Sequence, residues 1–217
     1  HHGRPISRAN GSLMECFRSF TGAAAPLDMV DVDTDQIAPT RFLLKPRAEG
    51  DYGGHLLHDL RYDEHGNERP DFILNQGPFR QAEILVANEN FGSGSSREQA
   101  ALCCADFGLK VIVAPSLGDI FKANCAKLGV VPAIVEGEAL ERLRESLHRT
   151  PGAEVTVDLV ERRIHGPGNW SERFEIEDYF RNRLLKGMDD FDLSQHHSDS
   201  IETFQRAYRV QFPWSEL

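Results

Sequence analysis

Short apolar runs alternate with longer amphipathic stretches in the middle of the chain. Three apolar runs, each typical of a buried strand, lie at residues 82–87, 110–115 and 130–135. Between them, residues 95–107 and 117–128 have helical spacing, and Gly129 follows the second stretch as a helix terminator. Because parallel strands connect through right-handed crossover helices, this order predicts a β-α-β-α-β core with a partly parallel sheet.

The segments on either side of this core follow other patterns. Residues 16–25 are strand-like, and residues 138–148 predict a helix with one leucine-rich face. After Pro151 the apolar positions alternate, which predicts an added β-layer with a turn at residues 166–169. Two further stretches have helical character, at residues 177–186 and 198–208.

Two regions lack such regularity. Residues 45–70 are rich in Gly, His, Asp and Arg, and they predict a long loop with a short helix near residues 55–60. Residues 1–13 begin with His-His and precede Met14, so we expect them to be a tag or cloning remnant. We therefore expect residues 14–217 to form a single α/β domain.

Charge and composition narrow the function classes. The 217 residues include 34 acidic side chains against 24 Lys and Arg, a formal net charge of −10. This acidity disfavours nucleic-acid binding, and an anionic substrate would need a local positive site. No apolar run approaches the roughly 20 residues that cross a membrane. No signal peptide follows Met14, so the expected location is the cytoplasm.

The cysteines do not form a metal-binding pattern. Cys103 and Cys104 are adjacent on a predicted helix, and neither they nor Cys16 and Cys125 form a C-x-x-C motif. A zinc site or an iron–sulfur cluster needs about three or four convergent ligands. We therefore expect no metal or cofactor to be bound by this chain alone, and we expect small core roles for the paired cysteines.

The stretch most informative about chemistry is residues 91–98, FGSGSSRE, between a predicted strand and a predicted helix. Its glycines predict a tight turn, and we expect Ser95 or Ser96 to cap the following helix. Helix N–H groups attract anions, and the Arg97 guanidinium suits a carboxylate, so the stretch predicts a pocket for a small acid. P-loop, dinucleotide and nucleophile-elbow motifs do not fit. The alternative is a plain capped helix with Arg97 in a surface salt bridge.

An acidic segment, Val30–Pro39, is the second candidate. Asp31, Asp33 and Asp35 alternate with other residues, and three carboxylates could bind a hard cation. No glycine-containing EF-hand loop is present, so we favour an Asx-turn with solvated aspartates. Arg41 lies six residues after Asp35 and is a further candidate ligand for a substrate carboxylate.

Both segments resemble one known family. Residues 32–43, VDTDQIAPTRFL, resemble the V-D-T-D-x-I-x-P-x-x-F-L opening of 3-isopropylmalate dehydratase small subunits. Residues 90–98, NFGSGSSRE, resemble that family's N-F-G-x-G-S-S-R-E loop, part of which also occurs in the swivelling domain of aconitase. The resemblance spans Met14 to Trp214. It implies a swivelling β/β/α domain in a hydro-lyase that isomerises 2-isopropylmalate and 3-isopropylmalate in leucine biosynthesis.

The resemblance also implies roles for individual residues. Ser95, the first serine of G-S-S-R-E, would be the catalytic base, with Arg97 stabilising its alkoxide form. Ser96 and Arg97 would hold a substrate carboxylate. Leu44 lies in the family's specificity loop, where relatives that act on longer acids place arginine, and its apolar side chain suits an isopropyl group. The remaining members of the expected substrate-binding set are Gly94, Asp35 and Arg41.

A partner follows from the same resemblance. The family's small subunits work with a large subunit that carries a 4Fe–4S cluster, which acts as a Lewis acid on the departing hydroxyl. The expected substrate is a small dicarboxylic or hydroxy-dicarboxylic acid. Gln99 stands where the family usually has histidine, and Ala38 stands where isoleucine is usual. These departures leave open a paralogous hydro-lyase for citraconate, dimethylmalate or homoaconitate, and, in another class, a non-catalytic dicarboxylate-binding module.

Overall fold

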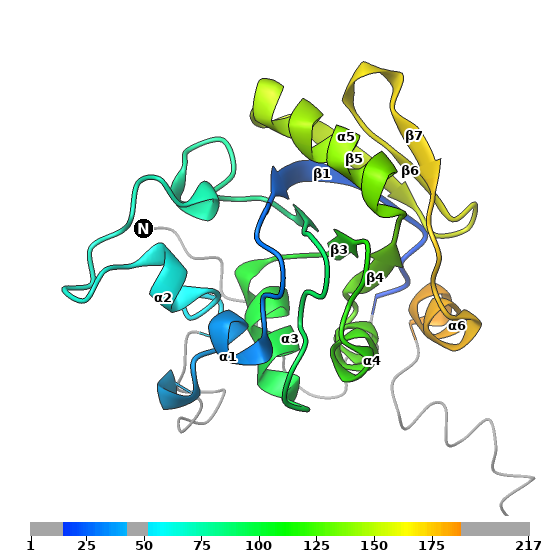
Figure 1. The fold of residues 1–217 in the computed structure, drawn as a ribbon. Helices are drawn as coiled ribbons and strands as arrows, with labels where there is room; N and C mark the ends of the chain where they lie inside the picture. Colours follow the sequence, from blue (N-terminus) through cyan, green and yellow to red (C-terminus); the bar gives the residue numbers. More distant parts are fainter. Residues whose placement is uncertain (1–14, 43–51, 188–217) are drawn as a thin grey trace, which may run out of the picture.

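One mixed sheet organises the fold (Figure 1). The computed structural model describes residues 15–42 and 52–187, and their seven strands follow the order β4-β3-β2-β1-β5-β6-β7. The strands are β1 (Ser19–Pro26), β2 (Ile84–Val86), β3 (Val111–Ala114), β4 (Val131–Ile134), β5 (Glu154–Asp158), β6 (Arg163–His165) and β7 (Ser171–Arg173). The α-helices are α1 (Thr34–Ile37), α2 (His58–Arg61), α3 (Glu98–Phe107), α4 (Asp119–Lys127), α5 (Gly137–Arg149) and α6 (Asp178–Lys186).

The strand directions divide the sheet into two halves that share β1. Strands β1 to β4 are parallel, and α3 and α4 connect β2 to β3 and β3 to β4, as the apolar runs predict. On its other side β1 pairs antiparallel with β5, and β6 and β7 continue the antiparallel half. The predicted β-layer is therefore a continuation of the core sheet. An antiparallel bridge between Ile134 and Glu175 then joins β4 to the chain that follows β7.

Helices bury both faces of the parallel half. Figure 1 shows α5 over one face and α3 and α4 over the other. Leu85 and Ile112 pack with α3, whereas Ile84 and Val113 pack with the leucine face of α5, because successive side chains of a strand point to opposite faces. The three leucines predicted on the α5 face, Leu140, Leu143 and Leu147, are all fully buried. Within the described residues, no helix is long and apolar enough to cross a membrane.

The start of α3 differs from the sequence prediction. The helix begins at Glu98, three residues later than expected, and the preceding Arg97 has extended backbone angles. Neither Ser95 nor Ser96 caps the helix, so that prediction was wrong. The physical reason is that the Arg97 N–H donates to the Ser95 carbonyl at 2.8 Å, which forms a separate turn before the helix. The predicted helix at residues 198–208 lies outside the described residues.

Candidate active site

Two loops run side by side at the carboxyl edge of the parallel strands. The first site loop (residues 31–40) follows β1, and the second site loop (residues 88–97) follows β2. Because β1 and β2 are adjacent and parallel, the chain leaves both strands at the same edge, where ligands commonly bind in such sheets. The Gly92 N–H donates to the Val32 carbonyl at 2.7 Å, and the Thr34 N–H donates to the Ser93 carbonyl at 2.9 Å. The two sequence motifs are therefore one structural unit.

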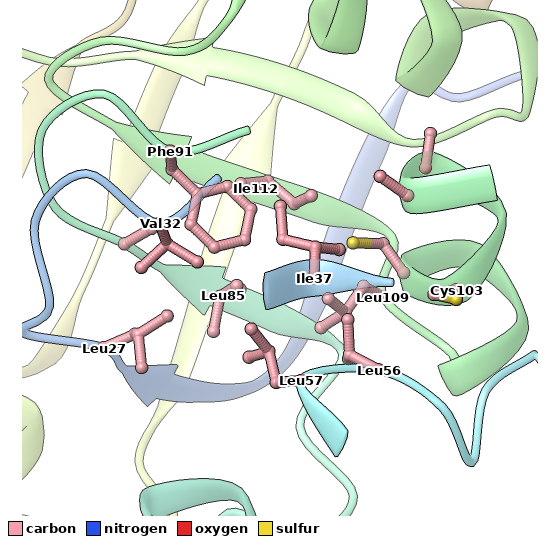
Figure 2. Close-up of a cluster of buried hydrophobic side chains, with 14 of the residues drawn as sticks. Leu27, Val32, Ile37, Leu56, Leu57, Leu85, Phe91, Cys103, Leu109 and Ile112 are labelled. Atoms are coloured by element: carbon pink, nitrogen blue, oxygen red, sulfur yellow. The ribbon is translucent and has the colours of Figure 1, made fainter. Parts of the chain in front are cut away.

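Buried side chains anchor both loops to the core. Val32 and Ile37 of the first loop region, and Phe91 of the second, are fully buried. Figure 2 shows these three side chains in one cluster with Leu85 of β2 and Ile112 of β3. Removing this apolar surface from water stabilises the loops as well as the sheet. The polar residues of the site thus lie on a rigid support.

The glycines of the second loop have conformations that other residues rarely adopt. Gly92 and Gly94 have φ angles of 75° and 99°, which confirms the predicted turn. A Cβ atom on Gly92 would lie only 2.4 Å from the Phe121 ring, whereas one on Gly94 would have its nearest neighbour, the Thr34 Oγ1, at 3.4 Å. Gly92 therefore allows the backbone to pack closely against Phe121, whereas Gly94 is needed for its positive φ angle, which turns the chain.

Arg97 and Asp35 join the two loops at their far end. Arg97 Nη1 donates to Asp35 Oδ1 at 2.5 Å and to Thr40 Oγ1 at 2.8 Å, and the Thr40 hydroxyl donates to the same Asp35 oxygen at 2.8 Å. The Thr40 hydrogen bond, followed by the Arg97 hydrogen bond, lowers the pKa of Asp35 below its usual value. Among the described residues, the guanidinium bonds only through Nη1, so its other donors remain for a carboxylate.

Two serines directly precede Arg97 in the second site loop. Ser95 and Ser96 are exposed, as is Gly94, and no described residue bonds to either hydroxyl. No side chain caps the helix α3 that begins at Glu98, so its first N–H groups have no side-chain acceptor. The site therefore combines two free hydroxyls, a cation and the positive end of a helix dipole.

The three aspartates of the first loop have three different partners. Asp33 caps α1, because its Oδ1 accepts from the Gln36 N–H at 2.8 Å while Gln36 Oε1 accepts from the Asp33 N–H at 2.9 Å. Asp31 accepts from Asn90, and Asp35 binds Arg97. Across the described residues, no group of three or more His, Cys, Asp or Glu side chains is placed to hold a metal ion. The capping geometry agrees with the Asx-turn interpretation.

Arg41 has a different environment from Arg97. Its two Nη atoms both donate to the carboxylate of Asp59 in α2, and its guanidinium lies 4.5 Å from the Phe42 ring centroid. The hydrogen bond from Arg41 lowers the pKa of Asp59. Arg41 is therefore held by an internal carboxylate and does not join the Arg97 cluster. The other specificity candidate, Leu44, lies outside the described residues.

Thr40 is a site residue that the sequence analysis missed. Thr40 bonds to both Asp35 and Arg97. It is uncharged, and it occupies a variable position between Pro39 and Arg41 of the first motif. The sequence offers one local indication of this role, which is a hydroxyl side chain five residues after Asp35 and shortly beyond α1. The paired cysteines, in contrast, are buried in α3 as expected, and burial raises the pKa of Cys104 and of Cys125 in α4.

Three comparisons with known proteins agree on one family. The sequence model of the aconitase C-terminal domain family matches residues 14–137. The 3-isopropylmalate dehydratase small subunits of Dinoroseobacter shibae and Paramagnetospirillum magneticum are each 42% identical over 93% of this chain and 100% of their own length. A crystal structure of 3-isopropylmalate dehydratase from Methanocaldococcus jannaschii has a TM-score of 0.60 at 25% identity, covering 85% of this chain and 99% of that one.

Proposed function

Because the chain belongs to the aconitase C-terminal domain family, among its 3-isopropylmalate dehydratase small subunits, we propose that its site loops form half of a hydro-lyase active site. The enzyme isomerises 2-isopropylmalate and 3-isopropylmalate by removing and adding water, in leucine biosynthesis. The observation that carries the assignment of the site is the exposed Ser95-Ser96 pair, which directly precedes an Arg97 that Asp35 already orients.

Ser95 is the proposed base. It takes the proton from the substrate carbon next to the one that bears the hydroxyl, so its oxygen must act with alkoxide character. A neutral serine is a weak base, but nearby positive charge stabilises the anionic form. The Arg97 guanidinium and the uncapped N-terminus of α3 supply that charge within a few residues of Ser95.

Ser96 and Arg97 are the proposed holders of a substrate carboxylate. Asp35 and Thr40 fix one nitrogen of the guanidinium, which leaves the remaining donors in a defined plane. A planar pair of donors binds a carboxylate in two parallel hydrogen bonds. Fixing the substrate in this way lowers the entropic cost of reaching the transition state. Gly94 contributes by turning the chain so that Ser95 and Ser96 face solvent.

The cysteines of this chain do not fit a 4Fe–4S cluster. A cluster needs convergent thiolates, whereas burial disfavours ionisation of Cys104 and Cys125. The part of the chain that the structure describes contains no three-residue metal-ligand group. We therefore assign the cluster to the large partner subunit, and the proton transfer and carboxylate binding described above involve only residues of this chain.

Replacing Ser95 tests this proposal. In the complex reconstituted with a large subunit, Ser95→Ala should lower turnover about 10²- to 10⁴-fold, the usual contribution of a general base, without weakening assembly. Ser93→Ala is the matched control, because it removes a hydroxyl from the same loop, and it should change turnover less than about threefold. Near-normal turnover of Ser95→Ala with intact assembly would remove Ser95 from the mechanism.

A substrate panel separates the remaining candidates. Isopropylmalate should give the highest kcat/KM of the wild-type complex, whereas a paralogous hydro-lyase would prefer citraconate, dimethylmalate or homoaconitate. A non-catalytic module would instead bind dicarboxylates as the isolated chain and gain no activity when the large subunit is added.

A further inference from the structure

Hydrogen bonds join the two site loops at several successive positions. The first bond between the loops is the one that the Asp31 N–H donates to the Glu89 carbonyl at 2.9 Å. The series continues through the Gly92 and Thr34 amides, which donate across at 2.7 and 2.9 Å, and ends at the Arg97–Asp35 pair. We call this set of bonds the loop ladder. It joins the two loops from Asp31 to Arg97.

The loop ladder begins at two unusual backbone positions. Asp31 and Asn90 have φ angles of 55° and 60°, in the left-handed region that is costly for residues other than glycine. They lie opposite each other, and Asn90 Nδ2 donates to Asp31 Oδ1 at 2.8 Å. The Asn90 N–H in turn donates to Ser116 Oγ at 2.8 Å. Asn and Asp are the residue types that tolerate this conformation best after glycine.

The positive φ angles of Asp31 and Asn90 bend both site loops, and these two bends affect how the loops pair. A single left-handed residue in one of two paired segments turns that segment away from its partner and disrupts the pairing. Here both segments turn at opposed positions, so the Gly92 and Thr34 bonds re-form beyond the kink. The side-chain bond between Asn90 and Asp31 joins the two kinks directly.

We propose that Asp31 and Asn90 are a positioning pair, which acts through the loop ladder to set where the Arg97 guanidinium lies. The importance of that position for catalysis rests on the proposed function. Neither residue touches the reacting atoms in this scheme. The pair needs one donor and one acceptor, which the Asn90 amide and the Asp31 carboxyl group supply.

A side-chain swap tests the pair. Asn90→Asp places two carboxylates face to face and should lower kcat/KM of the reconstituted enzyme about 10- to 100-fold, mainly through a higher KM. Asp31→Asn keeps an acceptor for Asn90 and should cost less than about threefold. The double variant with both changes has a donor at residue 31 and an acceptor at residue 90. Its kcat/KM should return to within about threefold of the wild-type value.

Asn169→Asp is the matched control. Asn169 is also exposed, with φ of 62°, but it lies in the turn between β6 and β7, and no described residue bonds to its side chain. This variant should change kcat and KM by less than about twofold and Tm by less than about 1 °C. A loss of activity equal to that of Asn90→Asp would mean that the effect is one of net charge, and it would overturn the pair.

Amide hydrogen exchange tests the pair without catalysis. On the purified full chain, Asn90→Asp should speed exchange of the Gly92 and Thr34 amides about tenfold or more, while the Val131 amide, which bonds within the sheet, stays unchanged. The double variant should restore the slow exchange. If exchange is unaffected by Asn90→Asp, or the double variant is no better than it, the positioning pair is refuted. If exchange follows the prediction but Ser95→Ala remains active, the pair stands and the proposed function fails.

Discussion

Alanine at Gly92 should destabilise the protein considerably more than alanine at Gly94, although both glycines belong to the same loop and both have positive φ. The left-handed backbone costs a residue with a Cβ about 1–2 kcal/mol, and this part applies to both positions. The difference comes from what the added Cβ meets. At Gly92 it would lie 2.4 Å from the Phe121 ring, but at Gly94 the nearest atom is 3.4 Å away.

The Phe121 ring has little room to move. It is 2% exposed and packs edge-on against Phe91 with ring centroids 5.6 Å apart. Overpacking a filled core costs about 1–3 kcal/mol. Gly92→Ala should therefore lose about 3 kcal/mol in the free energy of unfolding, and Gly94→Ala about 1–2 kcal/mol. For a chain of this size, these losses lower Tm by roughly 6–12 °C and 2–8 °C.

Urea and thermal denaturation of the purified chain, followed by far-UV circular dichroism, measures both losses. The double variant Gly92→Ala with Phe121→Leu separates the steric part, since a smaller side chain at residue 121 should reduce the cost of the alanine by at least about 1 kcal/mol. Equal losses at Gly92 and Gly94, or a cost at Gly92 that is independent of Phe121, would refute the packing argument. The backbone angle alone would then account for both variants.

Two further predictions use ionisation. Hydrogen bonds from Thr40 and Arg97 lower the pKa of Asp35, so its stabilisation is complete above its unfolded pKa of about 4 and is lost as the pH falls through the lower folded value. Asp35 is half-exposed, so Asp35→Asn should lower Tm by only about 1–3 °C at pH 7, with the gap closing towards pH 2; a constant gap would contradict this. For the thiols, burial raises the pKa of Cys104 and Cys125, whereas Cys16 is exposed. A disulfide reagent at pH 8 should label Cys16 quickly and the other cysteines only after unfolding, and rapid labelling of a second thiol would disagree.

The elements of the core were predictable because local periodicity determines them. Apolar runs of strand length gave β2, β3 and β4, and the spacing of Leu140, Leu143 and Leu147 gave the buried face of α5. The start of α3 was not predictable in the same way. Ser95 and Ser96 have the right side chains for a cap, but the turn closed by the Arg97 amide and the contact between Thr34 Oγ1 and the Ser95 carbonyl hold them outside the helix.

By itself the sequence supplied the candidate groups of the site, which are two hydroxyls, a guanidinium and an acidic loop, in motifs that identify the family. The tertiary structure alone decided which of these groups meet. Asp35 and Arg97 are 62 residues apart, and they pair because β1 and β2 are neighbours that end at one edge of the sheet. Thr40 bonds to both members of this pair, whereas Arg41 bonds to Asp59 of α2. Residue type and local spacing specify what a side chain can bind, whereas strand order specifies what lies within its reach.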